Sequence, residues 1–311
     1  MSSISKLLRY IFFDPLKFFD SLIAHCDFLF SDKLYLSLRY RCQMGGWIDW
    51  SNPQLYQEKL QWLKIYDRKD IYTTMVDKIL VKKYISSIIG EQYIIPTLGV
   101  WNSFDDIDFS SLPDQFVLKT NNGGGGTGVV VCTDKEKLNK QEAKKILEKA
   151  LRLSIYRKYR EWPYKNIRPQ IFAEAYMFDE SEFNKGGLSD YKFTCFNGAV
   201  DNVMVCVDRQ INEPKFYFFN KSWNLLPLNV RGKSVDPSFV LPKPDCMDEM
   251  FEIASKLSEN IPFLRVDLYC INDRPYFGET TFYPASGFDP NILPETEILF
   301  GERIILPKLN K

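Results

Sequence analysis

The stretch FVLKTNNGGGGTGVVVC, residues 116–132, carries the strongest structural signal in the chain. Short runs of β-forming residues flank a glycine-rich loop, so the stretch predicts a β-hairpin. Consecutive glycines cost backbone entropy on folding, and a protein keeps them where the backbone must approach another group closely. Backbone N–H groups without a neighbouring Cβ can surround a phosphate. The predicted phosphate-binding residues are Gly123, Gly124, Gly125, Gly126, Thr127 and Gly128.

Lys119 stands in an otherwise apolar strand, directly before this loop. Such a lysine either protects a strand edge from aggregation or pairs with an anion. Its position beside the glycines favours the anion, and the alternative is a hairpin tip without a ligand. The loop is not a Walker A motif, because no Gly-Lys-Ser/Thr follows and the next element is a strand rather than a helix.

A second signal lies near the C-terminus, where FLRVDLYC (263–270) and PYFGETTF (275–282) alternate like the two strands of a hairpin. A turn centred on Asp273 would set Asp267 opposite Glu279 and Arg265 opposite Thr281. The alternation also predicts two sets of residues that each share one face: Arg265, Asp267 and Tyr269 on the first strand, and Phe277, Glu279, Thr281 and Tyr283 on the second.

Two carboxylates placed opposite each other need a cation, because like charges at that spacing repel. Oxygen ligands select Mg²⁺ or Mn²⁺, and Mg²⁺ commonly joins one or two carboxylates to nucleotide phosphates. Arg265 beside them suits a phosphoryl group or a developing oxyanion. The alternative is a solvated acidic face on which Arg265 forms an ordinary ion pair, since a one-residue slip changes every pair.

Composition excludes several classes of function. The 311 residues include 40 Lys and Arg against 40 Asp and Glu, and this balance argues against a general nucleic-acid binder. The chain has a single histidine, His25, so a catalytic triad that needs a histidine would have to use this residue. The 7 cysteines are odd in number and contain no CxxC, which argues against a disulfide framework or a zinc site and fits a reducing compartment.

The N-terminal stretch KLLRYIFFDPLKFFDSLI, residues 6–23, is apolar but interrupted by charges, so it resembles neither a signal peptide nor a membrane span. It predicts short amphipathic helices, broken near Pro15, that pack on the body of the protein. The alternative is a peripheral contact of residues 1–30 with a membrane or with an assembly complex.

Hydrophobic periodicity predicts helices over 54–66, 71–88, 136–158 and 247–257. A buried strand is expected over 93–101, where Pro96 restricts it to a sheet edge or a strand end. Further strands are expected over 170–177, 190–196, 199–208 and 215–219. Helices and hairpins are segregated without regular βαβ alternation, which predicts an α+β architecture rather than a doubly wound sheet.

Several charged residues gain meaning from their order along the chain. The order is Lys78, Lys119 with the glycine loop, Glu174, Asp190 with Lys192, and finally Arg265, Asp267 and Glu279. It resembles the ATP-grasp superfamily. The blocks EKLQWLKIYDR, YIIPTLGVW, LPDQFVLK, REWPYKNIRPQIFAEAYM, DYKFTCFNG and the last hairpin are similar to the TupA-like ATP-grasp family over residues 54–308.

The resemblance implies two α+β modules that clamp ATP and divalent metal. It implies that Lys78 and Lys119 contact phosphates below the glycine loop, and that Asp190 and Lys192 contact ribose and phosphate. The implied adenine hinge is Glu174, Ala175, Tyr176 and Met177, and the implied metal ligands are Asp267, Glu279 and Thr281. The family usually has Glu-x-Asn where this chain has Glu-x-Thr.

The resemblance further implies a domain order: a helical extension (1–53), a preceding segment (54–100), a small subdomain with the glycine hairpin (101–178) and a C-terminal subdomain (179–311). The implied activity is an ATP- and Mg²⁺-dependent carboxylate–amine ligase that acts through an acyl phosphate, with Arg265 and Lys119 in catalysis. Its implied substrates are a small molecule or glycan with a carboxylate and an amine, in bacterial capsule or exopolysaccharide synthesis in the cytoplasm, at or near the inner face of the membrane.

Three alternatives remain from the residues. A sugar or small-molecule kinase would use the same ATP site. A glycosyltransferase often binds metal through Asp-x-Asp, and Asp106-Ile107-Asp108 has those letters, although a polar turn explains the triplet equally well. A nucleotide-binding scaffold without catalysis would be consistent with Thr281 in place of asparagine.

Overall fold

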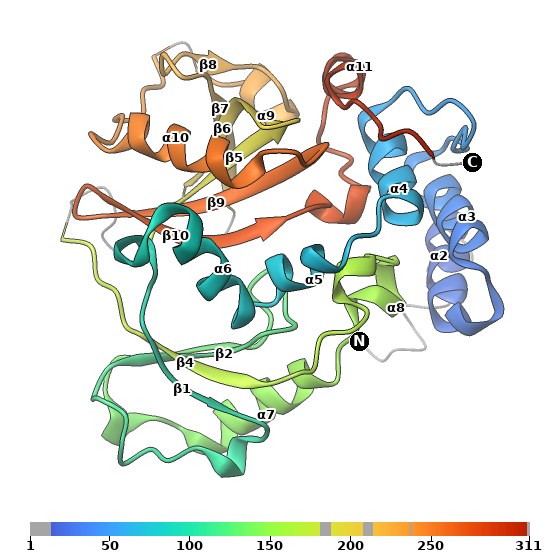
Figure 1. Ribbon diagram of the computed structural model, residues 1–311. Helices are drawn as coiled ribbons and strands as arrows, with labels where there is room; N and C mark the ends of the chain where they lie inside the picture. The colour runs from blue at the N-terminus through green and yellow to red at the C-terminus, as the bar shows by residue number, and fades with distance from the viewer. Residues whose placement is uncertain (1–13, 181–187, 208–213, 237, 310–311) are drawn as a thin grey trace.

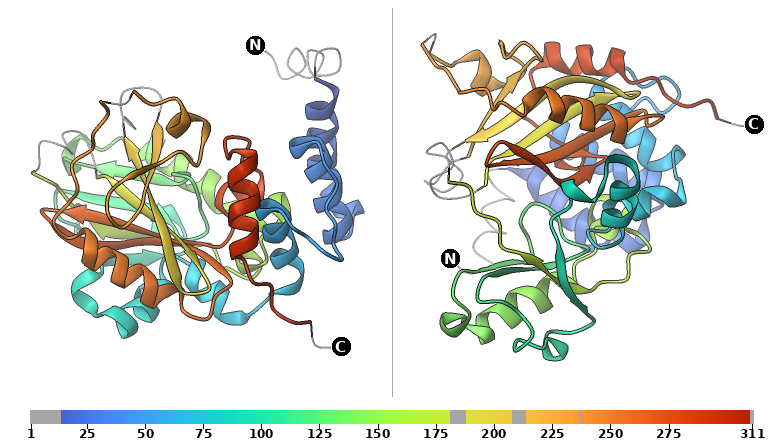
Figure 2. Two further views of the ribbon diagram at one scale, coloured as in Figure 1. Left: turned by 90° about the horizontal axis from the view of Figure 1, so that it is seen from above. Right: turned by 60° about the vertical axis from the view of Figure 1, so that its left-hand side comes forward.

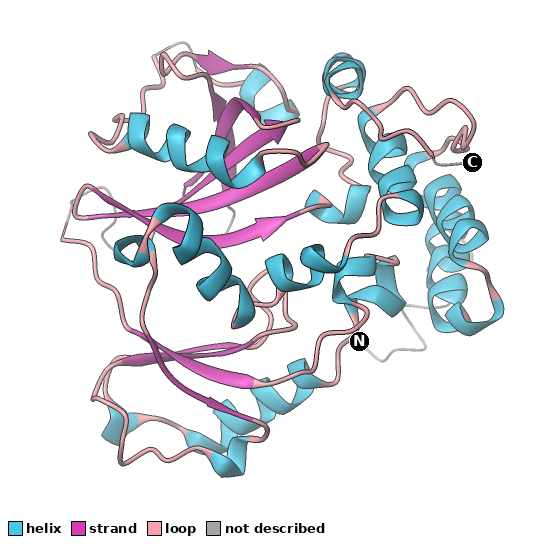
Figure 3. Cartoon of the chain, viewed as in Figure 1, coloured by secondary structure: helices cyan, strands magenta, loops and turns pink. Residues whose placement is uncertain are grey.

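The computed structural model describes residues 14–180, 188–207, 214–236 and 238–309. It contains two antiparallel sheets, one of four strands and one of six, which lie one above the other in Figure 1. Helices α5 (Asp70–Val76) and α6 (Leu80–Ile89) lie between them, and Figure 3 shows helices on the outer sides of both sheets. This is the α+β architecture that the sequence predicts.

The four-stranded sheet contains the glycine hairpin. Its strands are β1 (Thr97–Trp101), β2 (Phe116–Thr120), β3 (Val129–Cys132) and β4 (Ile171–Ala175), in the order β1-β4-β2-β3. Strands β2 and β3 pair antiparallel on either side of the loop, which confirms the predicted hairpin. Helix α7 (Lys140–Leu151) covers one face with Leu147, which packs in one core with Phe116 and Leu118. Strand β1 is an edge strand, as Pro96 requires, but it is largely exposed and not buried as predicted.

The six-stranded sheet carries the acidic hairpin. Its strands are β5 (Asp190–Phe196), β6 (Ala199–Val207), β7 (Lys215–Phe219), β8 (Leu225–Leu226), β9 (Phe263–Ile271) and β10 (Arg274–Thr281), in the order β10-β9-β5-β6-β7-β8. Helix α10 (Met247–Ser258) lies over β5, β6 and β9 (Figure 1) and buries its apolar stripe there. The opposite face therefore holds the polar residues of these strands.

The β9–β10 hairpin has the predicted pairing of Asp267 with Glu279, but its turn is shorter than predicted and a bulge corrects the register. The turn has only two residues, Asn272 and Asp273, both with positive φ (51° and 55°), as a type I′ turn requires. A bulge at Gly278 then shifts the register by one residue, so that Asp267 faces Glu279. The prediction that Phe277 shares a face with Glu279 was wrong, because before the bulge Phe277 pairs with Leu268 and both are buried in the apolar core.

Two predicted helices are each divided in the structure. The helix predicted over 71–88 is interrupted because the Asp77 carboxylate accepts hydrogen bonds from the backbone N–H groups of Ile79 and Leu80, where α6 begins. The helix predicted over 136–158 ends at Leu151, and α8 (Ile155–Tyr159) starts anew with Ser154 as its N-cap. The remaining α-helices are α2 (Pro15–His25), α3 (Asp32–Met44), α4 (Tyr56–Tyr66), α9 (Val230–Lys233) and α11 (Pro294–Arg303).

Helices α2 and α3 pack side by side at one end of the molecule (Figure 2). Helix α2 starts at Pro15, where a break was predicted, and residues 1–13 of the predicted N-terminal helices lie outside the described residues. Within the described ranges, no helix combines the length and apolar character needed to cross a bilayer. None of the seven cysteines, all of which lie in the described ranges, forms a disulfide.

Candidate active site

A row of charged side chains crosses three adjacent strands of the large sheet. Lys192 on β5 pairs in register with Asp267 on β9, and Asp267 pairs with Glu279 on β10. The Lys192 ammonium lies 2.5 Å from Asp267 Oδ2 and also donates to the Asp190 carboxylate. Lys192 therefore sits between two buried carboxylates, and the predicted proximity of Asp267 and Glu279 is confirmed.

Arg265 holds the next position along β9. Its Nε and one Nη each lie 2.7 Å from an oxygen of Asp267, which makes a bidentate pair, and the same Nη donates to Thr281 Oγ1 at 3.1 Å. Arg265 also forms an ion pair with Glu279, whose Oε1 lies 3.6 Å from the guanidinium. The guanidinium thus contacts all three residues that the resemblance implies as metal ligands.

The small sheet contributes a second group of charges around Glu174 on β4. Lys119 on β2 and Lys82 on α6 both form ion pairs with its carboxylate, and the Lys82 pair measures 2.6 Å. Lys82 also donates to Ile95 O and to Thr97 Oγ1. Lys82 was not among the residues predicted from the sequence, which named Lys78 of the Asp-Lys pair, four residues earlier and before α6 begins.

Lys78 joins the two sheets. Its ammonium donates to Gly123 O of the glycine hairpin at 2.6 Å and to Glu279 Oε2 of β10 at 3.1 Å. The segment is anchored beneath the hairpin, because Asn121 donates to the Asp77 carboxylate and accepts from Gln170 N. One side chain therefore connects the loop predicted to bind phosphate with the carboxylate predicted to bind metal, although these lie more than 150 residues apart in the sequence.

The glycines of the hairpin serve two purposes. At Gly128, φ is +74° and a Cβ would lie 2.6 Å from both Ala150 Cβ and Thr120 Oγ1, so the position admits only glycine for packing reasons. At Gly125 and Gly126, φ is also positive (+59° and +78°), but a Cβ would meet nothing within 4 Å. The middle of the loop therefore has open space beside these two glycines, and their positive φ favours glycine there.

The electrostatic balance of the site favours an anion. Five cations converge here with four carboxylates: Lys78, Lys82, Lys119, Lys192 and Arg265, with Glu174, Asp190, Asp267 and Glu279. Burial raises the pKa of Glu279, but Lys78 and Arg265 outweigh that effect and bring the pKa to about 2. Burial lowers the pKa of Lys192, and Asp267 more than restores it. Glu279 and Lys192 are therefore both charged at neutral pH. Counted formally, the nine side chains carry one positive charge in excess.

A family profile described as TupA-like ATPgrasp matches residues 58–305, which is most of the chain. The chain belongs to the TupA-like ATP-grasp family. The match confirms the resemblance seen in the sequence and makes the protein an ATP-grasp ligase by family. A search of curated proteins gave no match.

Solved structures similar to this ATP-grasp chain include D-alanine–D-alanine ligases. The enzyme from Helicobacter pylori has 18% identity and a TM-score of 0.41, with 81% of this chain and 69% of that chain covered. The enzyme from Bacillus anthracis has 16% identity and a TM-score of 0.42, covering 74% and 67%. D-cycloserine synthetase DcsG has 12% identity and a TM-score of 0.39, covering 74% and 69%.

The implied hinge of this ATP-grasp chain begins where β4 ends. Ala175 N donates to Pro96 O at 3.0 Å, and the chain leaves the sheet at Tyr176 and Met177. Ala175 and Tyr176 line a surface pocket together with residues of the β2 and β3 ends, Pro113, Asp114, Gln115, Thr133, Asp134 and Glu136. Three carboxylates in this lining, those of Asp114, Asp134 and Glu136, make the pocket unsuited to phosphate.

The Asp-x-Asp triplet has a local role. Asp106 accepts a hydrogen bond from Ser103 N, and Asp108 accepts from the N–H and the hydroxyl of Ser110. These contacts cap a short 3-10 helix and a turn, which is the polar-turn interpretation of the triplet. The residues that the glycosyltransferase alternative needs are therefore occupied in local structure.

Proposed function

We propose that this protein is an ATP- and Mg²⁺-dependent carboxylate–amine ligase whose active site is the cluster of charges joined by Lys78. The observation that carries the proposal is the Lys78 ammonium, which contacts both Gly123 of the glycine hairpin and Glu279 of the acidic row. A phosphate under the hairpin would lie next to those carboxylates, and a nucleotide bound through divalent metal requires this neighbourhood.

The triphosphate would be held by the cations of both sheets. Lys119 on β2 and Lys82 on α6 neutralise Glu174 beside the glycine hairpin, and we assign both as phosphate contacts. Lys192 is a further phosphate contact, with Asp190 next to it for the ribose. The excess of positive over negative charge supports a ligand with several negative charges. The adenine would lie at the hinge, against Tyr176 and Met177.

The residues on β9 and β10 fit a hard divalent cation. Asp267, Glu279 and Thr281 offer oxygen atoms only, which suits Mg²⁺ and also Mn²⁺. All three contact Arg265, so the guanidinium holds the donor set together. A bound metal would supply charge neutralisation at the transferred phosphoryl group. Thr281 is a weaker ligand than the asparagine usual in the family, so we assign the metal chiefly to the two carboxylates.

The proposed reaction activates a substrate carboxylate as an acyl phosphate with release of ADP, and an amine then displaces phosphate to form an amide. Such chemistry depends on positioning and charge stabilisation more than on a protein nucleophile. Arg265 is suited to stabilise the developing negative charge, because its guanidinium is fixed by Asp267 in the middle of the row. Lys119 would hold the phosphates in place at the opposite side.

We infer from the family's association that the carboxylate belongs to a sugar acid or glycan of a bacterial surface polysaccharide, and that the amine is an amino acid or similar small amine. The reaction would take place in the cytoplasm. Contact with the inner face of the membrane or with assembly machinery through residues 1–30 is supported by the exposed apolar side chains Leu16, Phe19 and Leu22 on α2 and Phe28 and Leu29 after it.

The test is incubation of the full chain with ATP, Mg²⁺, a uronic acid and a mixture of amino acids, with ADP and product mass as readouts. We expect ADP release that depends on both the carboxylate and the amine, and a product whose mass lacks phosphate. A product that retains phosphate would instead indicate a kinase. ADP formation that persists in Asp267→Asn and Lys119→Ala would contradict the assigned site, and its absence with every substrate pair would favour a scaffold.

A further inference from the structure

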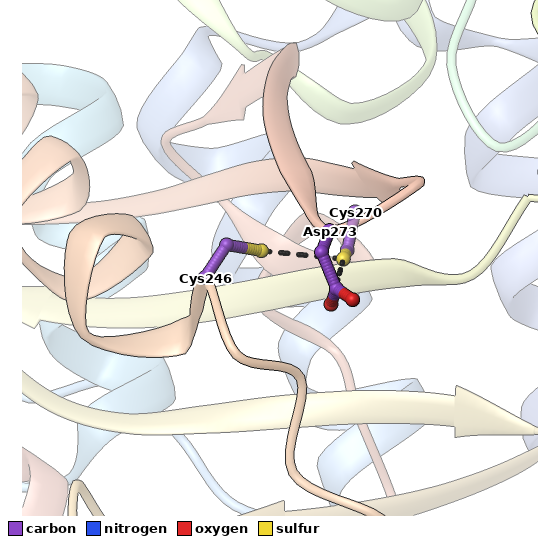
Figure 4. Close-up of side chains that lie close together, drawn as sticks. All are labelled: Cys246, Cys270 and Asp273. Atoms are coloured by element: carbon purple, nitrogen blue, oxygen red, sulfur yellow. Dashed lines mark hydrogen bonds between the residues drawn. The ribbon is translucent and has the colours of Figure 1, made fainter.

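Two buried thiols and a carboxylate meet outside the active site (Figure 4). Cys246 precedes α10, Cys270 lies in β9, and Asp273 lies in the β9–β10 turn. The two sulfur atoms are 3.2 Å apart, and Cys270 Sγ is 4.0 Å from Asp273 Oδ1. One ligand atom from each residue falls within 4.8 Å of the others. The absence of a CxxC motif argued against a zinc site in the sequence, where 23 residues separate these two cysteines.

The donor set matches zinc chemistry. Thiolate and carboxylate ligands bind Zn²⁺ at ~2.3 Å and ~2.0–2.2 Å, and tetrahedral geometry sets two sulfurs ~3.8 Å apart. The sulfurs of Cys246 and Cys270 would separate by only about 0.6 Å to reach that spacing. A disulfide at ~2.05 Å would require them to approach by about twice that amount. The observed spacing, at which Cys246 Sγ donates a hydrogen bond to Cys270 Sγ, is thus nearer to that of two zinc-bound thiolates than to that of a disulfide.

We propose that Cys246, Cys270 and Asp273 form a zinc site, with water as the fourth ligand. Both cysteines are buried and Asp273 is exposed, so the ion would have a path from solvent and an open side for the water. Binding forms two zinc–sulfur bonds and releases the two thiol protons to solvent. Asp273 Oδ1 accepts a hydrogen bond from Asp245 N at 3.3 Å, which orients the carboxylate towards the sulfurs.

The site would fasten the β9–β10 turn to the start of α10. The same turn contacts the segment that follows the implied hinge, because Asn272 Oδ1 accepts from Glu180 N at 3.1 Å and Asn272 Nδ2 donates to Phe178 O at 3.5 Å. Zinc would thus fix the support of this segment without contacting the nucleotide site. The zinc site is independent of the ligase proposal, since none of its residues belongs to the charged cluster.

The test uses Co²⁺ as a spectroscopic probe on the full chain, after removal of metals by a chelator under reducing conditions. We expect one equivalent of Co²⁺ to produce the thiolate-to-cobalt charge-transfer absorption, and Zn²⁺ to displace it. Carboxylates of the active site cannot produce this band, because they have no sulfur. The Cys270→Ser variant should abolish the band, and Cys132→Ser, which removes a buried thiol elsewhere, should retain it.

The Asp273→Asn variant keeps the proposal testable if Cys270→Ser does not fold, because Asp273 is exposed on a turn. It should weaken Co²⁺ binding at least 10-fold. Absence of the charge-transfer band in the wild-type protein would overturn the proposal. An unchanged band in Cys270→Ser, or unchanged affinity in Asp273→Asn, would also overturn it.

Discussion

Replacement of Lys192 by methionine removes the cation that lies between Asp190 and Asp267. The side chains of these two carboxylates are 8% and 3% exposed, and that of Lys192 is 9% exposed, so water cannot replace the lost charge. Removing one partner of a buried ion pair costs ~3–5 kcal/mol. Arg265 still neutralises Asp267, so we expect a loss near the lower end, ~3 kcal/mol of unfolding free energy.

The assay is urea denaturation followed by both tryptophan fluorescence and circular dichroism, with coincident transitions required. The midpoint should fall while the m-value stays constant. Lys137→Met is the matched control, because the Lys137–Asp134 pair is 84% and 39% exposed, and it should change the free energy by less than ~1 kcal/mol.

A double variant separates charge from packing. Addition of Asp190→Asn to Lys192→Met also removes the carboxylate charge that Lys192 neutralised, so it should recover part of the lost stability. A Lys192→Met protein within ~1 kcal/mol of wild type would refute the reasoning. A double variant less stable than the single variant would do so as well.

Three further predictions concern Lys82, the glycine hairpin and Glu279. Lys82→Met should weaken the binding of Mg·ATP about 10-fold, or ~1.4 kcal/mol, as measured by calorimetry. The reason is that Lys82 and Lys119 both pair with Glu174, so loss of Lys82 leaves one cation fewer for the phosphates. Unchanged affinity would limit Lys82 to a structural role. Gly128→Ala should lower the free energy of unfolding by more than ~2 kcal/mol, because the positive φ strains the backbone and the new methyl group overlaps Ala150. Gly125→Ala has the same backbone strain but meets open space, so it should cost only ~1–2 kcal/mol. Equal losses of the two variants in urea unfolding would contradict the packing argument. Because the pKa of Glu279 in the folded state is depressed to about 2, the stability that this carboxylate contributes is present above pH ~4.5 and is lost as the pH falls towards 2. The Glu279→Gln variant should therefore lose less unfolding free energy between pH 5 and pH 3 than the wild type. Equal losses in the two proteins would exclude Glu279 as a source of the pH dependence.

The strand pattern predicted which residues of β9 and β10 pair, but not the turn and the bulge that produce this register. Alternation placed Asp267 opposite Glu279, and the structure agrees. The predicted turn was one residue too long, and the bulge at Gly278 compensates for the difference. A bulge depends on close backbone approach, here of Gly278 to Asp267 O, and single-strand periodicity contains no information about it.

Contacts between distant segments were predictable only in part. The glycine run and Lys119 predict a ligand from the sequence alone, because consecutive glycines cost backbone entropy and a lysine is unusual in an apolar strand. Lys82 gave no such signal, because a lysine on an amphipathic helix is ordinarily solvated and its contact with Glu174 depends on how α6 lies between the sheets. The contact between Cys246 and Cys270 likewise depends on where α10 starts relative to β9.

The central claim is that the glycine hairpin and the carboxylates on β9 and β10 bind one nucleotide together through Mg²⁺. Calorimetric titration with a non-hydrolysable ATP analogue, with and without Mg²⁺, tests it directly. We predict that Mg²⁺ strengthens binding to wild type, that Lys119→Ala weakens binding in both conditions, and that Asp267→Asn abolishes the Mg²⁺ dependence. Equal affinity with and without Mg²⁺ in the wild-type protein, or the wild-type pattern in both variants, would contradict the account.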